Sequence, residues 1–154
     1  MDDELFMKEA IRLSESAAEH GNEPFGAVLV RDGQIVYSNE NRIFTLHDPS
    51  EHAEMGLIRR FCSETGITDL RDYTMYASCE PCFMCSGGLV YARLGRLVFA
   101  ASNMDLSQVL GKAGCSPSSI VFEYSVWKPQ VTSGVLRDEA VDVLRKYFAH
   151  HKKA

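Results

Sequence analysis

Two short segments of the sequence carry the residue types of a hydrolytic metal site. They are His52-Ala53-Glu54 and Pro81-Cys82-Phe83-Met84-Cys85, thirty residues apart. One imidazole and two thiolates make three protein ligands for a zinc ion, which leaves the fourth tetrahedral position to water, as in catalytic zinc sites. Glu54 is a carboxylate beside this site that is not itself a ligand, so it can carry protons. We therefore predict metal-assisted hydrolysis, with His52, Cys82 and Cys85 as ligands.

The order H-x-E followed by P-C-x-x-C is the signature of zinc-dependent nucleobase deaminases. The sequence resembles the cytidine deaminase-like superfamily, in its branch of guanine, cytosine and tRNA adenosine deaminases. The similarity extends beyond the motif to residues 24–28, Asn41, 48–49, 78–82, 93–101 and 131–148. The resemblance implies one Zn²⁺ per subunit and hydrolytic release of ammonia. It also implies a three-layer α/β/α fold around a central mixed sheet of about five strands.

The substrate-binding roles come from this resemblance alone. It implies that Asn41 hydrogen-bonds the base, that the backbone N–H of Ala53 contacts an exocyclic oxygen, and that Phe25 lines the pocket. In the implied reaction Glu54 takes a proton from water and delivers it first to the ring nitrogen and then to the departing ammonia. The resemblance further implies a homodimer or larger assembly, in which neighbouring subunits help to shape the pocket.

Hydrophobic periodicity predicts alternating helices and strands, and therefore an α/β layer fold with a largely parallel second half. An early hairpin turns at Asp32-Gly33, and residues 102–128 are the least regular part, a natural lid. The predicted helices are 3–20, a segment from Ser50 as N-cap to about 64, 81–93, 105–110 and 137–150. The predicted strands are 27–30, 35–37, 73–78, 97–101 and 131–133, and 41–50 is predicted as loop.

The spacing of the motif residues indicates how helices position them. Cysteines at i and i+3 lie on one helix face, and a helix beginning at Pro81 directs its first N–H groups toward them, which favours thiolates. His52 and Glu54 are two residues apart and would diverge in mid-helix. We expect both to face the metal because they lie in the first turn after Ser50, an expectation that depends on the family fold more than on spacing.

Composition limits the classes of function. A chain of 154 residues with 45% hydrophobic content fits one domain over residues 1–154. A formal net charge of -5 argues against a phosphate backbone as the main partner and favours a small neutral ligand. Lys152 and Lys153 make the chain end locally basic, which is typical of a solvated helix end. No membrane partner is expected.

The cysteines and the first residues of the sequence indicate the cellular compartment of the protein. The acidic start Met1–Leu5 lacks a cationic leader and an apolar core, and no apolar run approaches the roughly 18 residues that span a bilayer. Five cysteines, an odd number, indicate free or metal-bound thiols in a reducing compartment. We therefore expect a cytoplasmic protein.

Less specific interpretations of the same residues stay open. Cys79, three residues before Cys82, would close a Cys₃His structural site that has no place for water, although a helix starting at Pro81 leaves Cys79 outside it. The Cys-x-x-C pair alone also occurs in redox proteins. Glu51 is interpreted as an acidic residue that complements a helix N-terminus. His47 is mainly a surface candidate, with a smaller chance of substrate contact.

The substrate is predicted from a few segments. Pro-Phe-Gly-Ala and Ser-Cys-Glu-Pro-Cys resemble guanine deaminases, whereas the acidic pair common in their late loop is absent at 111–114. Asn41-Arg42 and residues 131–136 also resemble tRNA adenosine deaminases. We favour deamination of a free nucleobase, guanine or a related aminopurine or aminopyrimidine. The alternatives are tRNA adenosine-to-inosine deamination, cytosine or nucleoside deamination, and a non-catalytic structural zinc module.

Overall fold

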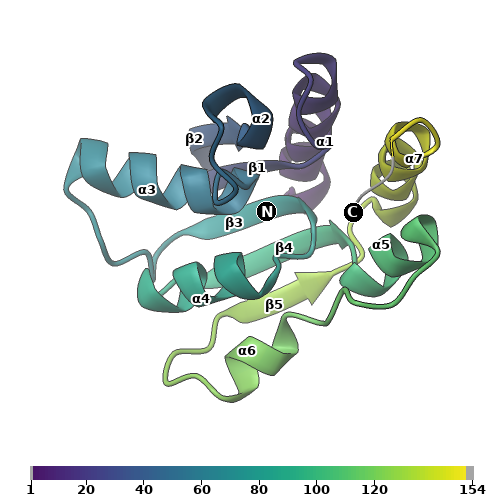
Figure 1. Ribbon diagram of the computed structural model, residues 1–154. Coiled ribbons are helices and arrows are strands. Elements are labelled where there is room, and N and C mark those ends of the chain that lie inside the picture. Colours follow the sequence, from purple (N-terminus) through teal and green to yellow (C-terminus); the bar gives the residue numbers. More distant parts are fainter. Residues whose placement is uncertain (1, 152–154) are drawn as a thin grey trace.

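A mixed five-stranded sheet forms the centre of the computed structural model, which describes residues 2–151 (Figure 1). The strands lie in the order β2-β1-β3-β4-β5. β1 pairs antiparallel with β2 and β3, whereas β3, β4 and β5 run parallel. Their bounds are Gly26–Arg31 (β1), Gln34–Glu40 (β2), Thr74–Cys79 (β3), Arg96–Ala101 (β4) and Gln130–Ser133 (β5). The predicted early hairpin and parallel second half are both confirmed.

Helices cover both faces of this sheet, so the predicted three-layer α/β/α fold is confirmed. α1 packs on β1 and β3, α7 packs on β4, and α5 packs against α7. On the opposite face α3 packs on β1 and β2, and α4 lies between α3 and α6. The helices are Asp3–Glu19 (α1), Ile43–Leu46 (α2), Ala53–Thr65 (α3), Phe83–Tyr91 (α4), Asn103–Leu110 (α5), Ser119–Glu123 (α6) and Arg137–Phe148 (α7).

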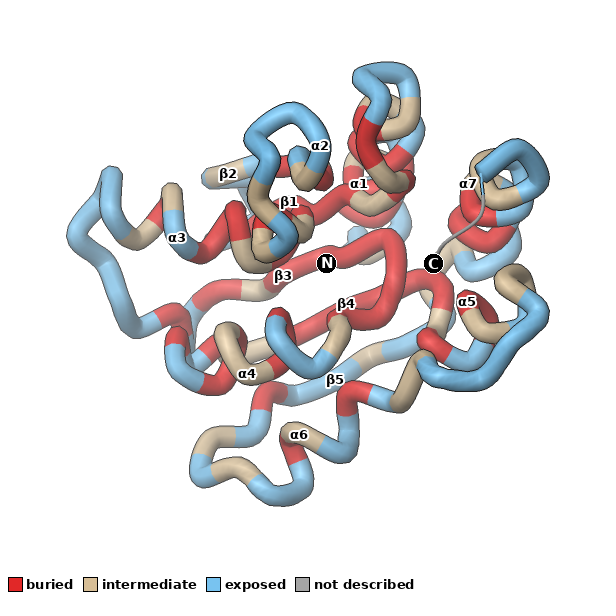
Figure 2. Tube along the Cα trace, viewed as in Figure 1, coloured by how far each residue is buried: buried red, intermediate tan, exposed pale blue. Residues whose placement is uncertain are grey.

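The two cores follow from the alternation of side chains along the strands. On β1, Leu29 belongs to the core under α3, together with Leu57 and Phe61 of that helix. Its neighbour Val28 belongs to the opposite core, together with Met7 of α1. Figure 2 shows the consequence, since β3 and β4 are buried almost throughout while the outer helices are exposed on their far sides.

The early hairpin turns where the sequence predicts it. Arg31 pairs with Gln34, so only Asp32 and Gly33 connect the strands. Both have positive φ angles, 51° and 74°. This two-residue turn with left-handed residues matches the right-handed twist of the strands, which explains the Asp-Gly sequence.

Several element boundaries differ from prediction. Ser50 is not the N-cap of α3, because its amide and hydroxyl both donate to Asp48 Oδ1 in the preceding turn; the N-cap is His52. Pro81 is not the first helical residue, because Cys82 keeps extended backbone angles and α4 begins only after it. Residues 41–50 are not all loop, since they contain α2.

The irregular segment 102–128 holds more helix than predicted. α5 begins two residues earlier than expected because Ser102 and Asp105 form a capping box at its start. α6 was not predicted at all. Among the described residues, no helix combines the length and the apolar character needed to cross a membrane. Lys152 and Lys153, which make the chain end basic, lie outside the described residues.

Candidate metal and active site

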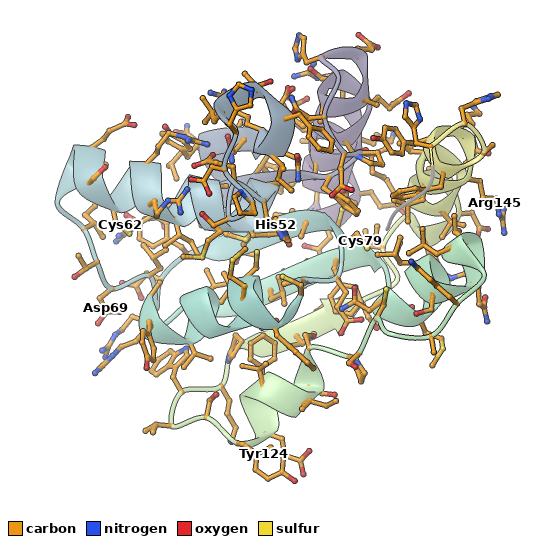
Figure 3. All side chains as sticks on the ribbon, viewed as in Figure 1. His52, Cys62, Asp69, Cys79, Tyr124 and Arg145 are labelled. Atoms are coloured by element: carbon orange, nitrogen blue, oxygen red, sulfur yellow. The ribbon has the colours of Figure 1, made fainter. Side chains whose placement is uncertain are left out.

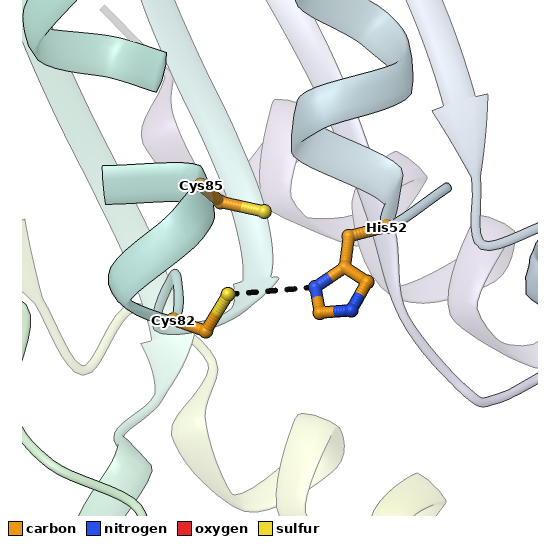
Figure 4. A group of neighbouring side chains, drawn as sticks. All are labelled: His52, Cys82 and Cys85. Carbon is orange, nitrogen blue, oxygen red and sulfur yellow. Dashed lines mark hydrogen bonds between the residues drawn. The ribbon is translucent and has the colours of Figure 1, made fainter. Parts of the chain in front are cut away.

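Two helix N-termini meet at the predicted site. His52 is the N-cap of α3 and Cys82 is the N-cap of α4, and both have extended backbone angles (φ -67°, ψ 155° and φ -72°, ψ -179°). Neither side chain makes the usual capping hydrogen bond. Cys85 follows on the first turn of α4, and Figure 4 shows all three side chains pointing toward one another.

The donor atoms of these three residues suit a zinc ion. The His52 nitrogen and the two cysteine sulfurs lie within 4.8 Å of one another, and Cys82 Sγ lies 3.5 Å from His52 Nδ1. Zinc prefers such nitrogen and sulfur donors in a tetrahedron, and three protein ligands are the number found in catalytic sites. Within residues 2–151 this is the only such group of potential ligands.

Cys79 is not part of the group, so the geometry does not support a closed Cys₃His site. It lies at the buried end of β3, where burial raises the pKa of its thiol well above the ordinary value. Cys79 is thus a buried cysteine that lines the cavity but lies outside the group of three donors.

The two predicted cysteine ligands differ in protonation. A hydrogen bond from the Cys85 thiol lowers the pKa of Cys82 to about 4, and the His52 imidazole adds to this effect. The same hydrogen bond and burial raise the pKa of Cys85. The pair therefore holds one proton between its sulfurs. Zinc binding releases such protons because both ligands must then be thiolates.

Glu54 has the environment of a proton carrier. It is the second residue of α3, is buried, and lines the same cavity as His52 and Cys82. Burial, followed by the negative charge of Cys82, raises its pKa to about 7. A carboxyl group that titrates near neutrality both accepts and returns protons efficiently. His52 and Glu54 face one cavity despite their spacing because His52 precedes the helix with extended backbone.

The cavity at this site has a volume of about 50 Å³. Phe25 lines it, as predicted, whereas Asn41 and Ala53 are not among its lining residues. Glu23, Glu80 and Asn103 line it as well, and the motif alone did not single them out. Cys79 and Leu106 complete the wall.

Asn41 is a buried side chain beside the pocket residue Phe25. Its backbone N–H donates to the Phe25 carbonyl at 3.0 Å, and its Oδ1 accepts a hydrogen bond from the Ile43 amide at 3.1 Å. These bonds tie the start of α2 to the strand entrance that carries Phe25. The hydrogen bond from Asn41 to a base stays a prediction.

A buried polar network holds the start of α3. Asn39 Nδ2 donates to the Ala53 carbonyl at 2.8 Å, and Arg60 donates to Asn39 Oδ1 at 2.7 Å. Glu51 is buried and pairs with both Arg59 and Arg60. Glu51 thus lies directly before the N-cap of α3, as its interpretation requires, and its carboxylate also orders two arginines of that helix.

A larger hollow of about 600 Å³ lies elsewhere, between the end of α4 and the residues after α6. Tyr124 and Trp127 line it, and Figure 3 shows Tyr124 far from His52. Its walls contain no carboxylate, thiol or imidazole. The smaller cavity, which brings all three together, is the better candidate for chemistry.

The family model for the cytidine and deoxycytidylate deaminase zinc-binding region matches residues 1–101, which include both halves of the site. The chain belongs to this deaminase family. It is 36% identical to the tRNA-specific adenosine deaminase of Bacillus subtilis over 154 residues, covering 98% of this chain and 91% of that protein. It is 39% identical to the guanine deaminase of the same organism over 109 residues, 70% of each chain.

Solved structures support the same assignment. A guanine deaminase from Nitrosomonas europaea superposes with a TM-score of 0.83 at 25% identity, covering 95% of this chain and 84% of that one. The protein is therefore a zinc-dependent deaminase, a hydrolase of carbon–nitrogen bonds. His52, Cys82 and Cys85 are a group that could hold its zinc ion.

One deaminase pocket residue had a signal in the sequence that prediction did not use. Glu80 stands between Cys79 and Pro81, directly after the buried strand β3, which contains no charged residue. A carboxylate at such a place is rarely buried unless it is paired. Glu23 and Asn103 carry no comparable signal, because only the fold brings their loops to the site.

Proposed function

We propose that this deaminase acts on a free nucleobase, guanine or a related aminopurine or aminopyrimidine. The observation that carries the proposal is the charge of the small cavity. Three of its lining residues, Glu23, Glu54 and Glu80, are carboxylic acids, and His52 is the only basic one. The negative charge of ionised carboxylates disfavours a phosphate group in this cavity, which supports a free base as the substrate.

In the proposed reaction each residue has a distinct task. When bound, zinc lowers the pKa of a coordinated water and so supplies a nucleophile near neutral pH. Glu54 would take one proton of that water and pass it to the ring nitrogen as oxygen bonds to the ring carbon. It would then move the remaining proton from this oxygen to the amino group, which leaves as ammonia when the carbon–nitrogen bond breaks and the carbonyl forms. Phe25 supplies an apolar wall for the ring, and the low polarity of the buried site strengthens each charge interaction.

Deamination of adenosine in tRNA is the second candidate. It is favoured by the extent of the match to the Bacillus subtilis tRNA-specific adenosine deaminase, which spans 98% of this chain. A tRNA substrate needs a basic surface, since neutralising phosphates supplies much of the affinity. The formal net charge of -5 weighs against that requirement.

We also infer a homodimer. On α4, Leu89 and Val90 are buried in the core, whereas Tyr91 is 91% exposed. Phe83 and Met84 of the same helix are exposed too. These apolar side chains provide a face that a second copy would cover. Light scattering should give a mass near twice 17.2 kDa, and a monomer at micromolar concentration would contradict the inference.

A substrate panel tests the function. Ammonia release is measured with guanine, cytosine, adenine, isoguanine, their nucleosides, and an anticodon stem-loop RNA. We expect turnover of a free base, with guanine first. Reaction of the RNA alone would refute the free-base proposal in favour of the second candidate. A zinc-loaded, folded protein that releases no ammonia from any of them would instead favour a non-catalytic zinc module.

A further inference from the structure

Glu80 is a buried carboxylate beside the zinc ligands that takes no part in the mechanism above. Its side chain accepts three hydrogen bonds. Oε1 accepts from the Asn103 amide at 2.9 Å, and Oε2 accepts from the amide and hydroxyl of Ser118 at 2.7 and 2.6 Å. Its own backbone N–H donates to the Ala101 carbonyl at 2.8 Å. Both carboxylate oxygens are therefore occupied by the protein.

Asn103 extends the same set of bonds. Its Nδ2 donates to the Pro81 carbonyl at 3.2 Å and to the Ser116 carbonyl at 2.9 Å. Pro81 directly precedes the ligand Cys82. The bonds of Glu80 and Asn103 thus join three segments: the loop that carries Cys82, the start of α5, and the chain at Ser116 and Ser118.

Residues 111–118 form a loop, called the 111–118 loop below. Its C-terminal end is held by the hydrogen bonds of Ser116 and Ser118 to Asn103 and Glu80. It leaves α5 at Gly111 and contains Gly114, with φ angles of 72° and 121°, so its backbone turns where a side chain would be strained. Residues 113–117 have no regular secondary structure, and Ser118 begins α6. Glu80 and Asn103 therefore fasten this loop beside the cavity that they both line.

We infer that Glu80 is a positioning residue that fastens the end of the 111–118 loop to the part of the substrate-pocket wall that Glu80 and Asn103 form. It acts on substrate binding and not on proton transfer, because its acceptor positions are taken by three protein donors. The inference rests on the proposed function in one respect, namely that the substrate occupies this cavity. It assigns the two buried acids separate tasks: Glu54 moves protons, and Glu80 orders the pocket.

A carboxylate is needed here for a physical reason. Three N–H and O–H donors converge on two oxygens, and each oxygen of a carboxylate accepts. A glutamine has one oxygen and one NH₂ group, so the NH₂ would face a donor. That leaves buried donors without partners, which costs more than the loss of an exposed hydrogen bond.

The test variant is Glu80→Gln in the full-length zinc protein, with Glu123→Gln on exposed α6 as the matched control. Hydrogen exchange of the amides of residues 111–118 is measured by mass spectrometry. The constants kcat and KM are measured with the best substrate of the panel. We expect exchange and KM to rise about tenfold in Glu80→Gln, the equivalent of one lost buried hydrogen bond. We expect kcat to stay within about threefold, with unchanged zinc content.

Two results would overturn the inference: unchanged loop exchange, or a fall in kcat at constant KM. Hydrogen exchange can be measured without substrate turnover. It therefore tests the role of Glu80 even if the proposed substrate is wrong. If Glu80→Gln does not fold, Ser118→Ala decides the question against the control Ser119→Ala. It removes one hydroxyl donor, so we expect a smaller rise in exchange and KM of about threefold; no difference from the control refutes the role of Glu80.

Discussion

The helix starts of this protein fall into two kinds. α5 begins with a complete capping box, in which Ser102 accepts from the Asp105 amide and Asp105 accepts from the Ser102 amide. α3 and α4 begin with His52 and Cys82, which make no capping hydrogen bond. The starts of α2, α6 and α7 also have no side-chain capping hydrogen bond, so the missing cap is not special to the site. What distinguishes α3 and α4 is that their N-cap side chains point at one another as potential metal donors.

The difference has an electrostatic basis. The first N–H groups of a helix have no partner within the helix and carry partial positive charge. At α5 this charge is satisfied by Ser102 and Asp105. At α4 it is left facing the thiolate of Cys82, whose pKa is lowered to about 4 in the first place by the Cys85 thiol. An uncapped helix start therefore favours the deprotonated ligands that zinc requires.

Removing a ligand at an uncapped start has the largest predicted effect. We expect Cys82→Ser to lose bound zinc and to lower ammonia release by more than about a thousandfold, because the nucleophile depends on the metal. Mass spectrometry measures the bound zinc, and an ammonia assay measures the activity. Cys62→Ser, in the same chain but partly buried on α3 away from the site, should keep both. Activity without zinc in Cys82→Ser would contradict the assigned site.

Glu54→Gln tests the acid that follows the other uncapped start. The amide has nearly the same shape but carries no proton to transfer, so we expect kcat to fall about 10²- to 10⁴-fold while zinc stays bound. Glu64→Gln, near the opposite end of α3, is the control and should change kcat little. Joint loss of zinc and activity in Glu54→Gln would show a structural role and refute proton transfer.

That His52, Cys82 and Cys85 lie together was predictable because the motif fixes both residue types and spacing. The alternation of apolar residues predicted the sheet and most helices. The capped start of α5 was predicted two residues late, and the uncapped starts were placed wrongly, at Ser50 and Pro81. Standard capping signals indicate where a helix would begin for stability alone. His52 and Cys82 do not follow these signals, because ligation and capping compete for the same side chain.

The remaining pocket residues could be identified only from the three-dimensional fold. Glu80 and Asn103 are separated by β4 in the sequence and meet only because β3 and β4 are parallel neighbours whose ends lie at one edge of the sheet. The arginine partners of Glu51 were not predicted, because Arg59 and Arg60 lie more than a helical turn away. Local pattern identifies ligands within a motif but not partners that the topology brings together.

In the zinc-free protein, substitutions at the two kinds of helix start should change the free energy of unfolding in opposite directions. Serine is a favourable N-cap, so Cys82→Ser should raise the free energy of unfolding of the zinc-free protein by about 0.5–1 kcal/mol. Ser102→Ala, which removes the real cap of α5, should lower it by about 1 kcal/mol. Urea denaturation in the presence of a chelator measures both. Equal destabilisation by the two substitutions would contradict this expectation, because a serine at position 82 would then not act as a better N-cap of α4 than Cys82.

The smallest predicted effect concerns the second capped helix start, that of α1, where the Asp2 side chain accepts from the Leu5 amide. A hydrogen bond from Arg96 lowers the pKa of Asp3, and the two side chains pair at 2.8 Å. A carboxyl group whose pKa is lower in the folded protein stabilises it above the unfolded pKa, and this contribution is lost as pH falls through the folded pKa.

We therefore expect Asp3→Asn to lower the free energy of unfolding at pH 7 by on the order of 1 kcal/mol or less, since the pair is partly exposed. The difference from the wild-type protein should shrink as the pH falls below about 4, where the unfolded carboxyl is protonated. Thermal unfolding at several pH values measures it, with zinc content unchanged. A difference that is independent of pH would assign the effect to packing at the start of α1 and not to charge.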